Sequence, residues 1–116
     1  MAVQTSTVSP GALIGPVVLI PMKANDWDAS LSVSLLVNFS GNPVTPAIGN
    51  VTVQVSNDPQ VAQNPLTARW NAHDILKNLT TDANDTLAAP VYAVRLIAAS
   101  MTSGTVQLAL GYQDQL

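Results

Sequence analysis

The sequence contains no cysteine and no glutamate, and it has a single histidine, His73. Without cysteine the chain forms neither disulfides nor thiolate metal sites, and one histidine is too few for an ordinary zinc or copper site. Charged residues make up 9% of the 116 residues, against about 25% in typical soluble domains. A surface with so little charge repulsion favours a protein docked against neighbours over one that diffuses as a free monomer.

Basic residues are also few, and the net charge is −3. They are scattered along the chain, at Lys23, Arg69, Lys77 and Arg95. Because they form no stripe that would neutralise phosphates, we expect no nucleic-acid partner. The apolar run 12–22 is interrupted by glycine and proline, and the N-terminus lacks the basic region of a signal peptide. We therefore expect no membrane partner and a protein made in the cytoplasm.

Alternation of apolar and polar residues predicts four strands, at 31–39, 51–55, 92–98 and 106–112. Turn residues follow three of these segments, as GNP after the first, NDP after the second and TSG after the third. The last two segments are predicted to form the strongest hairpin of the chain. Val17–Ile20 lies between prolines and is predicted to be an edge strand.

The remaining segments carry weaker patterns. Residues 1–11 are small and polar, which predicts an extended N-terminal arm, either disordered or captured by a neighbour. Residues 72–79 are compatible with a short helix or an irregular loop. Short strands without alternating helices predict an all-β fold, a single antiparallel β-sandwich that is jelly-roll-like and spans residues 12–116. A domain of this size has a large surface for its volume, which favours a homo-oligomer or a larger assembly.

The segment RWNAHD, residues 69–74, gathers the candidate functional side chains. Neighbouring side chains point in different directions on a strand or a helix, so we do not expect His73 and Asp74 to act as an acid–base pair. His73 is predicted to be a surface or cap-region residue, and Asn71 or Asp74 is expected to cap a helix start. Trp70 is predicted to plug the end of the sandwich, with a sugar-stacking platform as the alternative.

Acidic residues occur in two short clusters. These are Asp26 with Asp28, and Asp82 with Asn84 and Asp85. Carboxylate and amide oxygens suit calcium, but neither cluster has the dense ligand series of a dedicated loop, so we expect turn caps and no metal site.

The sequence also lacks the common catalytic and cofactor-binding motifs. It contains no phosphate-binding loop, dinucleotide fingerprint or nucleophile elbow, and it lacks the glutamates common in glycosidases. We expect no enzymatic activity, no catalytic residues and no cofactor. Arg95 is predicted to point away from a buried face set by Tyr92, Val94 and Leu96, either into solvent or toward an aspartate of a neighbouring strand or chain.

A succession of short motifs marks residues 50–112. In order they are VTVQVSNDP at 51–59, Trp70, HDILKNLT at 73–80, Asn84, LAAP at 87–90, VRL at 94–96 and TSGTVQL at 102–108. This succession resembles small β-sandwich structural proteins in the virions of tailed bacteriophages. The resemblance covers a little over half of the chain and implies a protein that acts by assembly, with no catalytic residues to transfer.

Together these features favour a head decoration or cement protein that binds the capsid lattice and stabilises it within the virion. Its expected partners are the major capsid protein or other virion proteins. The N-terminal arm and the edge strand Val17–Ile20 are expected to add to a neighbouring sheet. Two alternatives remain: a minor tail or baseplate component, and a carbohydrate-binding module that contacts host-surface glycans through Trp27 or Trp70.

Overall fold

The computed structural model describes residues 2–20, 33–39, 47–58, 60–87 and 91–112. Within these ranges the chain forms strands and no helix, which confirms the all-β prediction. The strands are β1 (Ala2–Val8), β2 (Val18–Leu19), β3 (Val33–Asn38), β4 (Ile48–Ser56), β5 (Asn71–Ala72), β6 (Ala83–Thr86), β7 (Ala93–Ser103) and β8 (Val106–Tyr112).

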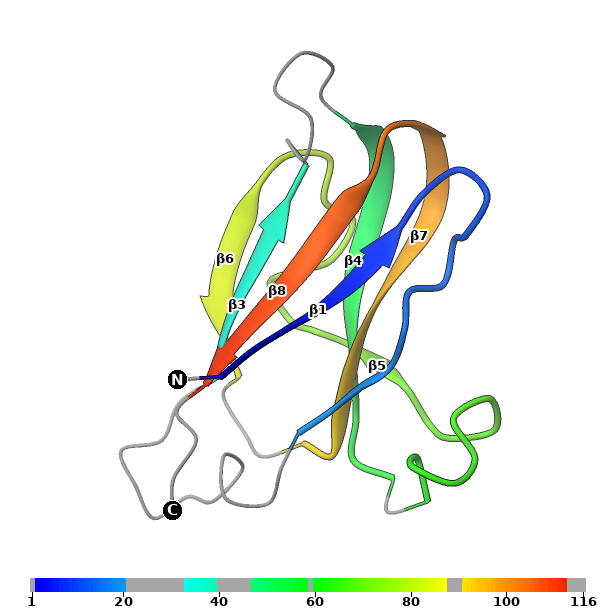
Figure 1. Cartoon of the computed structure of the whole chain (residues 1–116), viewed down its shortest axis with the longest axis vertical. Coiled ribbons are helices and arrows are strands. Elements are labelled where there is room, and N and C mark those ends of the chain that lie inside the picture. The colour runs from blue at the N-terminus through cyan, green and yellow to red at the C-terminus, as the bar shows by residue number, and fades with distance from the viewer. Residues whose placement is uncertain (1, 21–32, 40–46, 59, 88–90, 113–116) are drawn as a thin grey trace.

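The strands form two antiparallel sheets that pack face to face, so the predicted β-sandwich is confirmed. One sheet has the order β1-β8-β3-β6 and the other the order β2-β7-β4-β5. Figure 1 looks onto the first sheet, with the second behind it. Consecutive strands change sheet at every step except between β4 and β5.

The predicted hairpin of the last two strands is wrong. β7 pairs with β2 and β4, whereas β8 pairs with β1 and β3, so the two strands lie in different sheets. Leu96 of β7 and Leu108 of β8 are nevertheless fully buried in the same core. Period-two alternation identifies a half-buried strand, but it does not say whether the next strand lies beside it or faces it across the core. The connection passes through Gly104 at φ 77°, where a Cβ atom would lie 2.8 Å from Cα of Ala47.

The expectation of a separate N-terminal arm is also corrected. β1 pairs with β8 along its whole length, from Ala2 opposite Tyr112 to Val8 opposite Val106. Ser6 and Val8 are buried between the sheets. A strand is held by main-chain hydrogen bonds, which do not require an apolar pattern, so this polar segment was not recognisable as a strand.

The core lies between the two sheets and consists mainly of valine and leucine. Val94 and Leu96 are buried as predicted, whereas Tyr92 is 40% exposed. Tyr92 precedes β7, and its backbone joins two other segments by donating to Ser56 O and accepting from Ile20 N. Because Tyr92 lies outside β7, the alternation of side chains within β7 does not determine where the Tyr92 side chain points.

Residues 73–79 form an irregular loop, one of the two predicted alternatives. The loop continues the edge that β5 forms along β4: Val53 N donates to Leu76 O, and the backbones of Val51 and Leu79 exchange two hydrogen bonds. These backbone groups are therefore bonded to β4 and not to a helical turn. Leu76 projects from the loop into the core and is fully buried.

Candidate functional site

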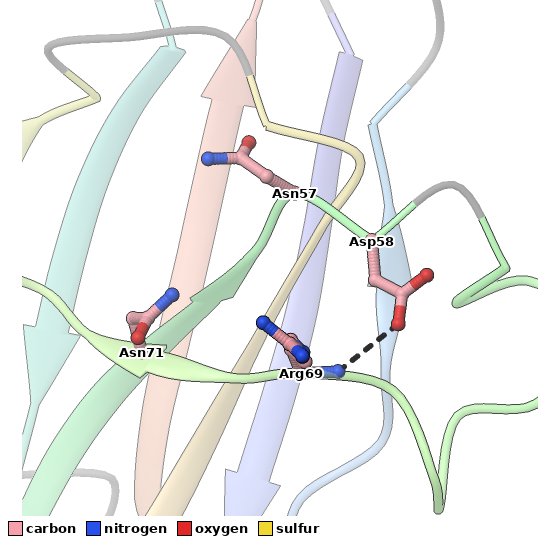
Figure 2. Close-up of a pocket in the computed structure, with 4 residues that line it drawn as sticks. All are labelled: Asn57, Asp58, Arg69 and Asn71. Atoms are coloured by element: carbon pink, nitrogen blue, oxygen red, sulfur yellow. Dashed lines mark hydrogen bonds between the residues drawn. The ribbon is translucent and has the colours of Figure 1, made fainter.

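Asp58 closes the loop that leads from β4 to β5. One carboxylate oxygen of Asp58 accepts a hydrogen bond from Gln60 N at 2.9 Å, and the other accepts one from Arg69 N at 3.2 Å. Figure 2 shows the second bond, which brings residue 69 back beside the start of the loop. β4 thus ends at Ser56, directly before the predicted turn residues, and Asp58 determines where the returning segment lies.

Trp70 anchors this returning segment to the sheet. The guanidinium carbon of Arg95 lies 4.2 Å from the centroid of the Trp70 ring. The indole N–H of Trp70 donates to Pro65 O at 3.1 Å, and Nε of Arg95 donates to the side-chain oxygen of Gln54 at 2.8 Å. Burial lowers the pKa of Arg95 by desolvation. The ring and the amide oxygen compensate for this lost hydration, because both interact favourably with a cation.

Trp70 lies on the outer face of the sheet β2-β7-β4-β5. Arg95 alternates with the fully buried Val94 and Leu96, so its side chain points away from the core. The expectation that Trp70 plugs the end of the sandwich is therefore corrected. Arg95 is neither fully exposed nor paired with an aspartate of the described chain; it is half-buried beneath the tryptophan.

Four polar residues line a pocket of about 350 Å³ beside this anchor: Asn57, Asp58, Arg69 and Asn71. Arg69 and Asn71 flank Trp70 in an extended segment, where alternate side chains point to opposite sides. Trp70 packs against Arg95 on the sheet, whereas its two neighbours line the pocket. Figure 2 shows these two neighbours with Asn57 and Asp58. We call this the polar pocket.

The polar groups of this pocket retain hydrogen-bonding capacity. Asn57, Arg69 and Asn71 are exposed. Among the described residues, the Arg69 guanidinium and the two asparagine amides have no hydrogen-bond partner. The backbone beneath them is held in place, because Asn71 belongs to β5 and pairs with Val55. The arrangement can offer several donors and acceptors to a polar ligand.

His73 follows β5 and organises the adjoining loop. Its Nδ1 accepts hydrogen bonds from the backbone N–H groups of Ile75 and Leu76, both at 3.1 Å. Its Nε2 lies 3.0 Å from Thr86 O and therefore donates to that carbonyl. His73 therefore makes ordinary hydrogen bonds in a cap region, as predicted. The described segment forms a loop and no helix, so the helix cap predicted for Asn71 or Asp74 is wrong. Both ring nitrogens are bonded to backbone, so the ring is a structural link between the 73–79 loop and β6.

A second pocket of about 320 Å³ lies next to His73. Apolar side chains, including Val55, Leu87 and Val91, form part of its wall, together with Asp85 and His73. Asp85 accepts a hydrogen bond from Thr86 N at 2.8 Å. His73 and Asp85 therefore bind backbone that lines this pocket, and Asp74 adds a third ionisable group to its wall.

Of the two acidic clusters, only the second lies in the described residues. Asp26, Trp27 and Asp28 are outside them. Asp82 accepts a hydrogen bond from Phe39 N at 2.7 Å, and Asp85 lies within β6. Both carboxylates therefore bind backbone, but neither is the predicted turn cap. Within the described ranges no three acidic, histidine or cysteine residues gather to form a metal site.

No family model, curated protein or solved structure matches the chain. In the part of the chain that the structure describes, no helix is long and apolar enough to cross a membrane.

Sequence reasoning identified Trp70 and the turn at Asp58 but not the polar pocket that they create. The available signals were the alternation of Arg69 and Asn71 around a tryptophan and an aspartate in the preceding turn. Neither signal shows that Asp58 binds Arg69 N, eleven residues further along the chain.

Proposed function

We propose that this chain is a structural virion protein, a decoration protein that binds the head lattice of a tailed bacteriophage and stabilises it. The major capsid protein is its proposed partner. The observation that carries the proposal is an uncharged, apolar edge of the sandwich. Its residues lie between β1 and the end of β2.

The edge is formed by residues 12–19, which run along β7. Ala98 N donates to Leu13 O, Gly15 N donates to Leu96 O, and β2 pairs with β7. Three large apolar side chains project from this segment into solvent: Leu13 is 41% exposed, Ile14 60% and Leu19 46%. These side chains stand along an outermost segment of the sheet β2-β7-β4-β5.

No charged residue occurs from residue 2 to residue 20. This stretch includes both β1 and β2, which are terminal strands in the orders of their sheets. Soluble proteins commonly protect such edges with lysine or other charges, because an apolar edge promotes association. An edge without that protection supports a protein whose edge is covered by a neighbour, either a capsid subunit or a second copy of the chain.

The order of the strands supports the same assignment. We infer a jelly-roll connectivity from the orders β1-β8-β3-β6 and β2-β7-β4-β5, with strands alternating between the sheets. Jelly rolls of eight strands occur in viral capsid domains and in lectins. The low charge of the whole chain is also consistent with a surface that faces neighbouring subunits.

Electron microscopy of intact phage particles tests this proposal. We expect density for a two-sheet sandwich at regular positions on the head lattice, with residues 12–19 against a neighbouring subunit. Density at the tail or baseplate would contradict the decoration role and favour the minor tail component. Absence of the protein from purified particles would contradict any role in the virion.

Substitutions separate the edge from the rest of the surface. We expect Ile14→Thr and Leu19→Thr to reduce occupancy on particles, because each removes exposed apolar area from the proposed contact. Leu66→Thr is the matched control, since Leu66 is 90% exposed in the loop between β4 and β5. Equal occupancy for all three variants would show that residues 12–19 do not form the contact. Deletion of residues 1–11 would remove β1, so it would test folding and not docking.

A further inference from the structure

The polar pocket concentrates hydrogen-bonding groups in a chain that has few charges. Its lining residues are Asn57, Asp58, Arg69 and Asn71, whereas only 9% of the whole chain is charged. The volume of about 350 Å³ is within the roughly 300–1,000 Å³ typical of small-molecule pockets.

The groups in the pocket include both donors and acceptors. The guanidinium of Arg69 offers several N–H donors, and each asparagine amide offers both a donor and an acceptor. The Asp58 carboxylate accepts two backbone N–H groups, one on each oxygen, and each oxygen has a further lone pair. The pocket therefore matches a ligand that donates and accepts hydrogen bonds at several neighbouring positions.

Charge narrows the ligand class. Arg69 and Asp58 carry opposite charges, so the charges of the described lining residues balance. An anionic ligand would meet the Asp58 carboxylate and a chain of net charge −3, and a cationic ligand would meet the Arg69 guanidinium. Each of the four described lining residues carries a polar group, so a ligand without hydrogen-bonding groups would leave these groups unpaired.

The backbone of the pocket is also held in place before any ligand binds. Asp58 is fixed by two backbone N–H groups, and the segment from Arg69 to Asn71 is fixed by the contact of Trp70 with Arg95 and by β5. Fixed groups lose less conformational entropy on binding than mobile ones. The pocket thus has the rigid backbone that a weak polar ligand requires.

We propose that the polar pocket binds the hydroxyl groups of an uncharged sugar, either a free monosaccharide or a terminal unit of a glycan. Vicinal hydroxyl groups both donate and accept hydrogen bonds, which is the pattern that this lining complements. Recognition comes from Asn57, Asp58, Arg69 and Asn71. Trp70 positions two of these residues and packs its ring against Arg95.

Two-dimensional NMR of the isotope-labelled full chain tests this site. The probes are glucose, galactose, mannose and N-acetylglucosamine, with glucuronate and galacturonate as charged counterparts, added at millimolar concentrations. We expect at least one neutral sugar to shift the backbone signals of Asn57, Arg69 and Asn71 in a saturable way. A response to the charged sugars alone would overturn the proposal, as would the absence of any response.

Two pairs of variants locate the binding. Asn71→Ala should reduce the affinity at least severalfold, whereas Asn84→Ala, the same change at an exposed position of β6, should leave it unchanged. Arg69→Gln should also reduce the affinity, whereas Lys77→Gln removes an exposed positive charge outside the lining and should not. Unchanged spectra away from the substituted residue show that each variant is folded. Equal affinity in Asn71→Ala and Asn84→Ala would overturn the assignment of the site.

A further comparison distinguishes a free sugar from the terminal unit of a glycan. Once a monosaccharide that binds is known, its affinity is compared with that of an oligosaccharide that ends in the same sugar. Equal or tighter binding of the oligosaccharide identifies a glycan terminus as a ligand. Binding of the free monosaccharide alone restricts the proposal to the free sugar. The outcome does not depend on where the protein lies in a particle, so this proposal and the decoration role can fail separately.

Discussion

Ser6 and Leu96 are linked across the two sheets, because the backbone N–H of Leu96 in β7 donates to the hydroxyl oxygen of Ser6 in β1 at 3.2 Å. The same hydroxyl donates to Pro16 O at 2.7 Å. Pro16 has no N–H and interrupts the pairing between the 12–19 segment and β7. The buried Ser6 hydroxyl therefore bridges two backbone groups that lie where this pairing is interrupted.

Loss of this hydroxyl should destabilise the fold. Ser6→Ala leaves the buried Leu96 N–H and Pro16 carbonyl without their partner, which costs about 1–3 kcal/mol. Thr5→Ala is the control, since Thr5 is exposed on the same strand. Urea denaturation of the two variants and the parent measures the difference. A Ser6→Ala variant as stable as Thr5→Ala would show that the bridge does not contribute.

Gly15 is required by the close packing around the same bridge. A Cβ atom on Gly15 would lie 2.9 Å from the carbonyl oxygens of Thr7 and Leu96 and would also collide with the Ser6 hydroxyl. We expect Gly15→Ala to lower the free energy of unfolding by about 1–3 kcal/mol. Gly11→Ala meets nothing within 4 Å and should be close to neutral. Thermal denaturation measures the stability of both variants. Equal stability of Gly15→Ala and Gly11→Ala would show that small backbone shifts relieve the collision.

His73 should stabilise the fold by linking the 73–79 loop to β6. His73→Ala removes the acceptor for two backbone N–H groups and the donor to Thr86 O, and we expect a loss of about 1–3 kcal/mol. His73→Asn should be less destabilised than His73→Ala, because the oxygen of its short side-chain amide can accept hydrogen bonds from local backbone N–H groups. Amide hydrogen exchange at Ile75 and Leu76 measures the cap directly. We expect faster exchange at these two amides in His73→Ala than in His73→Asn. Identical exchange in these two variants would contradict the assigned role of Nδ1.

The contact between Trp70 and Arg95 should contribute a measurable coupling energy. We expect Arg95→Ala and Trp70→Ala, combined in a double-mutant cycle, to give about 0.5–1 kcal/mol, the usual range for a partly exposed cation–π contact. Arg95→Lys should retain part of it, because the charge remains but the planar group is lost. A coupling energy of zero would mean that the two side chains are close without stabilising each other.

The positions of the long strands were predictable because their signal is local. Alternating valines and leucines at 51–55 and 106–112 appear in the structure as β4 and β8. β1, β5 and β6 were not predicted, since they are short or polar and are defined by their partners. β5 consists of Asn71 and Ala72, which become a strand only because β4 offers Val55 and Gln54 for pairing.

The candidate site was predictable only in its parts. Trp70 and the aspartate turn stand out in the sequence, and the alternation of residues 69–71 indicates that Trp70 and its neighbours point in opposite directions. The partner of Trp70 did not follow, because Arg95 lies on β7 and is brought beneath the ring by the pairing of β7 with β4. Nor did the partner of Asp58 follow, because it is a backbone N–H, a group that every non-proline residue carries.

The sequence by itself determined that this protein is a β-sandwich with an uncharged N-terminal segment, because composition and period-two alternation are local properties. Only the tertiary structure decided which strands are neighbours, that residues 2–8 belong to the sandwich and that Trp70 lies on its outer face. These features depend on contacts between residues far apart in the chain. Such contacts are stabilised by burial of side chains from both segments and by hydrogen bonds between backbone groups, which nearly every residue carries. The local pattern of side chains therefore does not predict which segments meet.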